Sequence, residues 1–389
     1  MKKRLIFLVS FLLSFSVGIA AYTNSSFIES FGGKKMVGVL FALGACCGIA
    51  VLSQAAVIIG RIGIRNFFLR CAGIQAIAFV LLVTSSVPAL QAAAFVGYLA
   101  SIYALAYSVD VFFEHVMPVG ARGKTRGIFL LLGNCAWLAA PLAGIHLKDA
   151  FGYRGIYLVA LLILAVCAAV IVFGLSKYTD AKYTPDRSRF TFARALKHPR
   201  FRAVICANFI LQFFYAWMVV YMPIYLHEHL GFSWNSLAFV FTGMLLSFVI
   251  LDYPLGKIAD HFGSEKEFAA IGFVIMIISV LGFFFIPNPT LLEVGILLFV
   301  SRVGAATVEA MTEIHFFKIA KDSEPGLLSV FRDLSPLSYL VAPLIGTVII
   351  SFMPFRSLFI ILAFVLVFGL ASALRMEKNS AWWKRSHTA

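Results

Sequence analysis

Three ionisable residues stand inside one apolar stretch of the chain, near residues 291 to 316: Arg302, Glu309 and Glu313. Spacings of seven and four residues place their side chains on one face of a helix. A charge inside lipid costs on the order of 3 kcal/mol by insertion scales, so such groups usually face a cavity or a partner. Because Arg302 is the deepest of the three, its guanidinium is a candidate contact for an anionic solute or for a carboxylate.

A second acidic pair repeats this pattern earlier in the chain. Asp110 and Glu114 are also four residues apart, and a shift of 199 residues places them on Glu309 and Glu313. Asp110 and Glu309 lie about one turn deeper than their partner acids, where partial desolvation favours a carboxyl that binds and releases a proton. Glu114 and Glu313 lie near the ends of their stretches, where contact with water or pairing with a loop explains them at least as well as a role in transport. Static ion pairs with neighbouring helices are the alternative for Asp110 and Glu309.

Two further groups of polar residues accompany these charges. The same shift places Tyr103 on Arg302, which makes Tyr103 a candidate for the solute cavity. Asn208, Gln212 and Tyr215 follow one another at spacings of four and three and form one polar face on an otherwise apolar helix. Hydrogen bonding between helices explains this face as well as contact with a solute does.

Elements of a membrane protein must position these residues. Apolar side chains make up 61% of the 389 residues and charged ones only 13%, against roughly 25% in soluble proteins. The apolar runs are continuous rather than alternating, which indicates helices and excludes a β-barrel. Twelve runs are expected to span the membrane, near 5–25, 36–59, 66–86, 90–114, 127–147, 154–175, 204–226, 236–255, 268–286, 291–316, 328–351 and 355–374.

The basic residues orient these spans. Of the 32 Lys and Arg, 26 fall in segments that are cytoplasmic if the N-terminus is cytoplasmic. This bias follows the positive-inside rule and predicts that both termini are cytoplasmic. The protein itself is expected in the plasma (inner) membrane. It also makes a nucleic-acid partner unnecessary as an explanation of the +14 net charge.

The chain is expected to be an internal duplication. A shift of about 200 residues superposes the apolar runs, and Ala140-Pro141 then falls on Ala342-Pro343. The predicted domains are an N-terminal six-helix half (1–175), a cytoplasmic linker loop (176–203) and a C-terminal six-helix half (204–389). The linker carries eight basic residues, so it is a tether that can touch anionic headgroups; a regulatory docking segment is the alternative.

One loop motif resembles a known family. Residues 256 to 266 read GKIADHFGSEK, which is similar to the loop signature of the major facilitator superfamily. The resemblance implies that Gly256, Asp260 and Gly263 steady one conformation of a transport cycle. In the first half, Arg61 and Gly63 occupy the matching turn, although Gly60 stands where the signature has its Asp. Asp252, Arg332 and Asp333 lie at the same ends of their spans and are interpreted with these residues as a cytoplasmic gate.

The resemblance also implies a central cavity lined by spans one, four, seven and ten, which contain the polar residues described above. The expected function is secondary active transport of a small polar or anionic solute by alternating access, coupled to protons, by a monomer in the lipid bilayer. Export of amphipathic drugs or lipids is one alternative, and a non-transporting sensor or assembly protein is another. No nucleotide-binding loop, nucleophile–base pair or metal-ligand spacing occurs, so no enzyme activity, cofactor or metal is expected.

Overall fold

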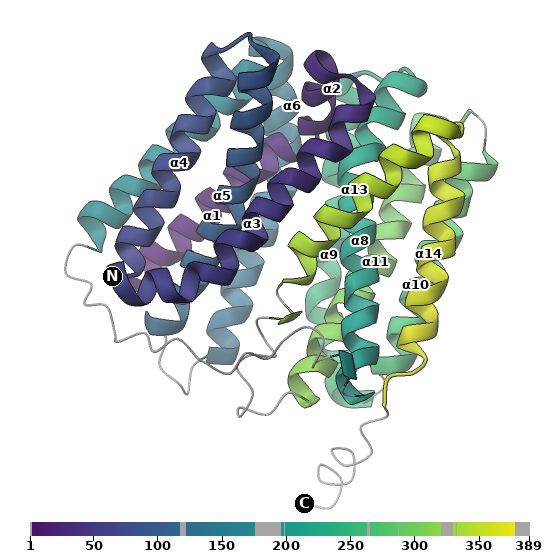
Figure 1. Ribbon diagram of the computed structural model, residues 1–389. Helices are drawn as coiled ribbons and strands as arrows, with labels where there is room; N and C mark the ends of the chain where they lie inside the picture. Colours follow the sequence, from purple (N-terminus) through teal and green to yellow (C-terminus); the bar gives the residue numbers. More distant parts are fainter. Residues whose placement is uncertain are drawn as a thin grey trace, which may run out of the picture. The chain divides into compact units, whose positions relative to one another are not determined.

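The computed structural model describes residues 2–116, 122–175, 196–197, 199–262, 265–286, 288–319, 330–331 and 333–377 (Figure 1). Over these residues the chain is helical and has no strand. The helices are α1 (Lys2–Ala21), α2 (Asn24–Gly32), α3 (Lys34–Ile62), α4 (Ile64–Thr84), α5 (Pro88–Val116), α6 (Arg122–Ala169), α8 (Pro199–Ile224), α9 (Trp234–Phe262), α10 (Glu265–Phe285), α11 (Leu291–Ile319), α13 (Leu334–Phe352) and α14 (Ser357–Ala373), with π-helical turns η2 (Val170–Gly174) after α6 and η3 (Tyr225–His229) after α8.

Ten of the helices in the described part of the chain are long and apolar enough to cross a membrane. The predicted apolar runs coincide with them to within a few residues at most ends. The short helix α14, with 17 residues, is equally apolar but below the length of the other ten. The chain is therefore a multi-pass helical membrane protein.

Helix α6 is interrupted by a glycine. Its 48 residues would extend for about 72 Å at 1.5 Å per residue, more than twice the thickness of a hydrocarbon core. Gly152 breaks it with φ 68° and ψ −172°, a left-handed backbone conformation that a residue with a Cβ rarely adopts. The break falls in the gap between the predicted runs 127–147 and 154–175.

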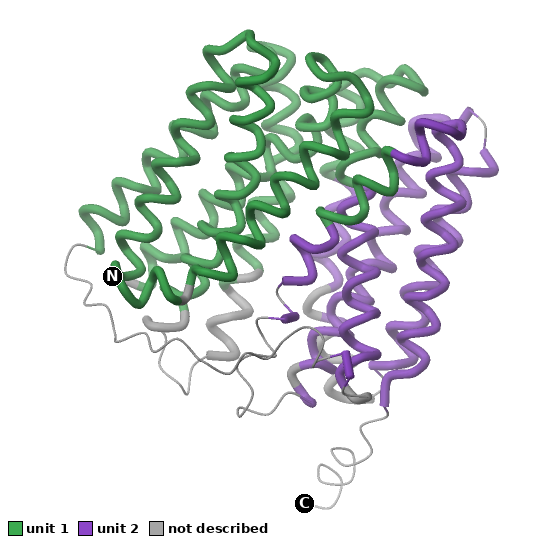
Figure 2. Tube along the Cα trace, in the orientation of Figure 1, with its two compact units in different colours: residues 1–185, 219–242, 339–347 green, residues 186–218, 243–338, 348–389 purple. Residues whose placement is uncertain are grey.

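The described helices group into two compact units (Figure 2). Unit 1 comprises residues 1–185, 219–242 and 339–347, and unit 2 comprises residues 186–218, 243–338 and 348–389. In unit 1, α1 packs along α6, while α3 and α4 pack on α5; in unit 2, α10 packs between α11 and α14. This grouping cuts through α8, α9 and α13, because the end of α8, the beginning of α9 and the middle of α13 belong to unit 1.

Residues from both sequence repeats meet inside unit 1, near helix α2; we call this region the α2 end. The rings of Tyr22 and Phe241 stack with centroids 4.7 Å apart. The ammonium of Lys148 lies 4.2 Å from the centroid of the Trp234 ring. Lys34 Nζ donates to His229 Nε2 at 3.3 Å and lies 3.7 Å from Glu29.

Gly38 of α3 lies against α13 at the α2 end. A Cβ at position 38 would overlap the hydroxyl of Thr347 and the carbonyl of Pro343. The same carbonyl accepts a hydrogen bond from the Tyr221 hydroxyl, which also contacts Thr347 Oγ1 at 3.0 Å. Only a glycine permits so close an approach of the two helices. The contact therefore joins the N-terminal repeat to the C-terminal repeat through main-chain atoms.

Candidate solute and proton sites

Arg302 is the centre of a site in unit 2. It lies in the twelfth position of the 29-residue helix α11 and its side chain is 2% exposed. The guanidinium carbon stands 5.0 Å from the ring centroid of Phe214 and 5.6 Å from that of Tyr215, both on α8. These rings stabilise the cation through their electron-rich faces. Nε and Nη1 have no hydrogen-bond partner among the described residues, so the cation is buried with donors still to be satisfied.

Tyr215 connects this cation to Glu309, which lies two turns along the same face of α11. Its hydroxyl donates to Glu309 Oε2 at 2.8 Å, and both side chains are half-buried. Glu309 lies seven residues beyond Arg302, about 10.5 Å along the helix axis. One aromatic side chain thus faces the guanidinium with its ring and the carboxylate with its hydroxyl.

The polar face predicted on α8 divides into two parts. Gln212 Nε2 donates to Asn208 Oδ1 at 3.4 Å, a contact between successive turns of the same helix. Asn208 is 5% exposed. Of the three residues, Tyr215 is thus the one whose hydrogen bond reaches α11.

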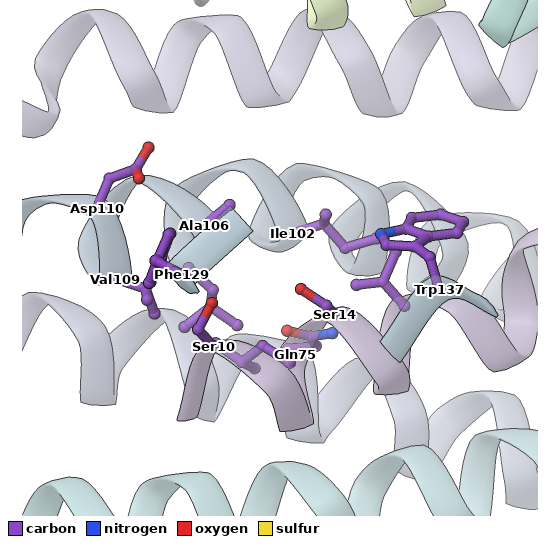
Figure 3. Close-up of a pocket in the computed structure, with 12 residues that line it drawn as sticks. Ser10, Ser14, Gln75, Ile102, Ala106, Val109, Asp110, Phe129 and Trp137 are labelled. Atoms are coloured by element: carbon purple, nitrogen blue, oxygen red, sulfur yellow. The ribbon is translucent and has the colours of Figure 1, made fainter. Parts of the chain in front are cut away.

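Asp110 lines a different space, a cavity of about 270 Å³ inside unit 1 (Figure 3). Residues of helices α1, α4, α5 and α6 line it. Asp110 and Trp137 lie toward opposite ends, with Ser14 and Gln75 beside each other between them. The lining residues are Ser10, Leu13, Ser14, Val17, Gln75, Ile102, Leu105, Ala106, Val109, Asp110, Phe129 and Trp137.

Tyr103 does not line this cavity. A Cβ on Gly48 of α3 would overlap its ring, so the tyrosine packs between α5 and α3. The predicted equivalence of Tyr103 and Arg302 rests on the sequence shift alone, and the described contacts of the two residues differ.

Sequence reasoning did not single out Gln75 or Trp137. Gln75 is 1% exposed and its Oε1 has no hydrogen-bond partner in the described part of the chain. A signal was available: Gln75 is the one amide in the apolar stretch 71–83. Ser14, a polar residue of the first span, also lines the cavity.

The residues predicted at the cytoplasmic gate are only partly described. Arg61 is exposed near the end of α3, and Gly63 ends that helix with φ 81° while its N–H donates to the carbonyl of Ile59 at 2.8 Å. Glu313 is half-buried on α11. Gly256 lies within α9, whereas the side chains of Glu114, Asp252 and Asp260, and the whole of Gly263 and Arg332, lie outside the described residues.

Asp333 precedes the first residue of α13. Its carboxylate makes no capping hydrogen bond to that helix, and burial raises its pKa from the ordinary 3.8 to about 6.

No group of His, Cys, Asp and Glu that could hold a metal ion occurs over the ranges that the structure describes.

Comparison with known proteins agrees with these features. The sequence profile of the Major Facilitator Superfamily matches residues 6–306 and again residues 204–388. The fold resembles that of a mutant of the nucleoside transporter NupG, with a TM-score of 0.73 and 12% identity over 97% of this chain and 100% of the other. The chain belongs to the major facilitator superfamily.

Relatives by sequence carry one name. The multidrug resistance protein MdtG of Citrobacter koseri is 23% identical over 265 residues, and that of Escherichia fergusonii is 24% identical over 266 residues. Each match covers 65% of this chain and 63% of the relative, so the chain spans just under two thirds of the length of these curated relatives.

Proposed function

We propose that the chain is a secondary active transporter of a small polar or anionic solute, working by alternating access. The observation that supports this is Arg302: a cation that is 2% exposed and leaves Nε and Nη1 unpaired among the described residues. Leaving buried charged donors unsatisfied is costly, and an anionic group of a solute would remove that cost.

The proposed topology has twelve spans, in the halves 1–175 and 204–389 joined by the cytoplasmic linker 176–203, with both termini cytoplasmic. Ten apolar helices, the division of α6 at Gly152 and the short helix α14 support this number. Cysteine labelling tests the orientation: positions 61 to 65 should be inside and 227 to 235 outside, and the reverse pattern would overturn it.

Protons are the proposed coupling ion, with Glu309 and Asp110 as the carriers. The hydrogen bond from Tyr215 to Glu309 supports a link between the two steps, because the same tyrosine ring contacts Arg302. A solute anion on Arg302 would change the field at Glu309 through one shared neighbour, although the two side chains are two turns apart.

The decisive experiment has two stages. Purified protein is first heated with a panel of carboxylates, organic phosphates, nucleosides and quaternary ammonium compounds, since a bound ligand stabilises the folded state by mass action. Uptake of any stabilising compound is then measured in proteoliposomes for the native protein, Arg302→Ala and Arg302→Lys. We expect anionic compounds to stabilise, Arg302→Ala to abolish uptake, and lysine to rescue poorly because it lacks the planar fork of donors.

A matched control uses Arg154, an exposed arginine that donates to Ser86 Oγ at 2.8 Å in unit 1. Arg154→Ala should transport normally. Full uptake by Arg302→Ala would remove Arg302 from the solute site.

Multidrug export is the second candidate, and the likeness to MdtG proteins favours it. In that case cationic or apolar compounds would stabilise the protein and Arg302→Ala would still export them. A protein without transport activity, acting as a sensor or assembly partner, would respond to no compound in the panel.

A further inference from the structure

We propose that Lys34, His229 and Glu29 form a latch at the α2 end of unit 1, and that acid opens this latch. The three side chains come from α3, η3 and α2, so the latch joins the N-terminal repeat to the C-terminal repeat. Lys34 is the member that both contacts share. A proton added to either partner therefore removes a contact of the same lysine.

The contact with His229 requires a neutral imidazole. Lys34 Nζ lies 3.3 Å from His229 Nε2, and an ammonium group can only donate hydrogen bonds. Nε2 must therefore be the unprotonated nitrogen of the ring. Protonation of the imidazole removes this acceptor and places a second positive charge beside the ammonium, so that an attraction becomes a repulsion.

The contact with Glu29 requires an ionised carboxylate. Lys34 Nζ lies 3.7 Å from Glu29 Oε1, whereas Glu29 Oε2 is buried and has no hydrogen-bond partner among the described residues. Burial raises the pKa of this carboxyl above its ordinary 4.5, against the opposing effect of the Lys34 charge. Protonation of Glu29 removes the charge that attracts Lys34.

Glu228 is a further charged group that faces the latch. Its charge acts on both Glu29 and His229. Its own cationic neighbours are His227, whose Nε2 lies 3.9 Å from Glu228 Oε1, and Lys148. A protonated His229 is therefore drawn toward Glu228 and away from Lys34. Two titratable groups of α6 interact with this cluster as well, Asp149 and Tyr153.

The latch lies one helical turn from a close approach of two helices. Lys34 begins α3, and Gly38, four residues later, lies against the backbone of Pro343 on α13. Loss of both contacts at Lys34 frees the first turn of α3 beside this approach, so we expect acid to loosen the α2 end. In the proposed topology this end faces the outside, and the latch then responds to the external pH. The effect requires neither a solute nor Arg302.

Distances between two spin labels test the latch in the purified full-length protein. The six native cysteines are replaced, and labels are attached at Lys35→Cys on α3 and Asn235→Cys on α9, two exposed positions of the α2 end. Double electron–electron resonance is recorded at about pH 5 and about pH 8, which bracket the ordinary histidine pKa of about 6.5. We expect a longer-distance population to grow in acid. The ratio of the two populations should change about two- to fivefold, because contacts this exposed each contribute little.

Neutral variants separate the latch from other effects of acid. His229→Gln keeps an acceptor for Lys34 without titrating, and Glu29→Gln keeps the size of the acid without its charge. The double variant should lose the response to pH. Lys34→Met removes the shared donor and should give the longer distance in both samples. His146→Gln is the control and should respond like the native protein, since His146 is exposed on α6 and contacts the carbonyl of Leu142.

Three results would overturn the inference: distances in the native protein that do not change with pH, a native response in the His229→Gln/Glu29→Gln protein, or a Lys34→Met protein that keeps the shorter distance in both samples. The measurement contains no solute and no transport step. A failure here therefore leaves the Arg302 proposal standing, and a failure of the Arg302 proposal leaves the latch standing.

Discussion

The Tyr215 hydroxyl donates to Glu309 at 2.8 Å while the ring of the same tyrosine lies 5.6 Å from the Arg302 guanidinium. A tyrosine is suited to this position, because its ring face attracts a cation and its hydroxyl stabilises a carboxylate. Movement of either charge alters the position of the ring, and hence the surroundings of the other. Tyr215 is therefore the residue through which solute binding and proton binding are expected to influence each other.

Tyr215→Phe should uncouple the two events. The ring contact with Arg302 remains, whereas Glu309 loses a hydrogen bond of the kind that contributes ~1.5–3 kcal/mol to a charged group. We expect solute exchange in proteoliposomes to continue and accumulation driven by a pH gradient to fall by roughly tenfold, following the ~1.4 kcal/mol that each factor of ten represents.

Tyr157→Phe provides a control, since it also removes one buried hydroxyl, which donates to Asn24 Oδ1 at 2.9 Å in unit 1. Unchanged accumulation by Tyr215→Phe would show that Glu309 does not depend on this hydrogen bond.

Glu309→Gln and Asp110→Asn test the carriers themselves. Each amide keeps the size and much of the hydrogen bonding of the acid but cannot release a proton. Both variants should exchange solute across the membrane at close to the native rate, yet fail to concentrate it against a gradient. Glu293→Gln, an exposed acid on the first turn of the same helix α11, should behave like the native protein. Normal accumulation by both variants would mean that neither acid carries the proton.

Asp333 should make stability depend on pH. Its folded pKa of about 6 lies above the ordinary 3.8, so its ionisation destabilises the folded state. The contribution of protonated Asp333 to the free energy of unfolding is fully present below about pH 4 and is lost as the pH rises through about 6. Asp333→Asn should therefore melt a few degrees above the native protein at pH 8 and at the same temperature near pH 4.

Melting curves of detergent-purified protein across this range are the measurement. Asp149→Asn, at an exposed position, is the control and should leave the pH profile unchanged. A native melting temperature that does not change between pH 4 and 8 would contradict the raised pKa of Asp333. The same pH dependence of melting in Asp333→Asn and in the native protein would also contradict it.

Gly38→Leu should prevent closure of the α2 end. The side chain would collide with the backbone of Pro343 and with Thr347. A protein with its six native cysteines replaced and with the Tyr22→Cys and Phe241→Cys pair should be cross-linked efficiently by a short bifunctional reagent, because the two rings stack at 4.7 Å. Adding Gly38→Leu should reduce this cross-linking several-fold, whereas Gly73→Leu, where a Cβ meets nothing within 4 Å, should not.

Most of the long helices were predictable, because an apolar run of about 20 residues has one stable form in lipid. The break at Gly152 also agrees with a gap between predicted runs. Helix α2 was not predicted, since its nine residues, NSSFIESFG, contain no long apolar run even though residues 24 to 28 are buried. Its burial comes from packing on α3 and α5 rather than from its own composition.

A site residue could be predicted where burying its own charge in lipid costs free energy. A contact that depends on how two helices cross could not be predicted from the sequence. A mid-span arginine must be buried against something, and Arg302 is 2% exposed. That Tyr215 bridges it to Glu309 depends on the crossing of α8 and α11. Gln75 was not predicted, because it is a neutral amide and the prediction used charged residues. That its Oε1 has no hydrogen-bond partner among the described residues is visible only in the structure.

Arg302 also affects how the protein is made. As helix α11 leaves the ribosome, the arginine lowers its preference for lipid, and its mean hydropathy of 1.8 is well below the 2.7 of the preceding α10. The two helices cross at Gly272 and Gly304, where a Cβ on either glycine would come within 2.7 Å of the other's carbonyl oxygen. Helix α10 is therefore expected to insert first and to draw α11 in as a hairpin. A side chain at this crossing is expected to weaken the hairpin and with it the insertion of α11.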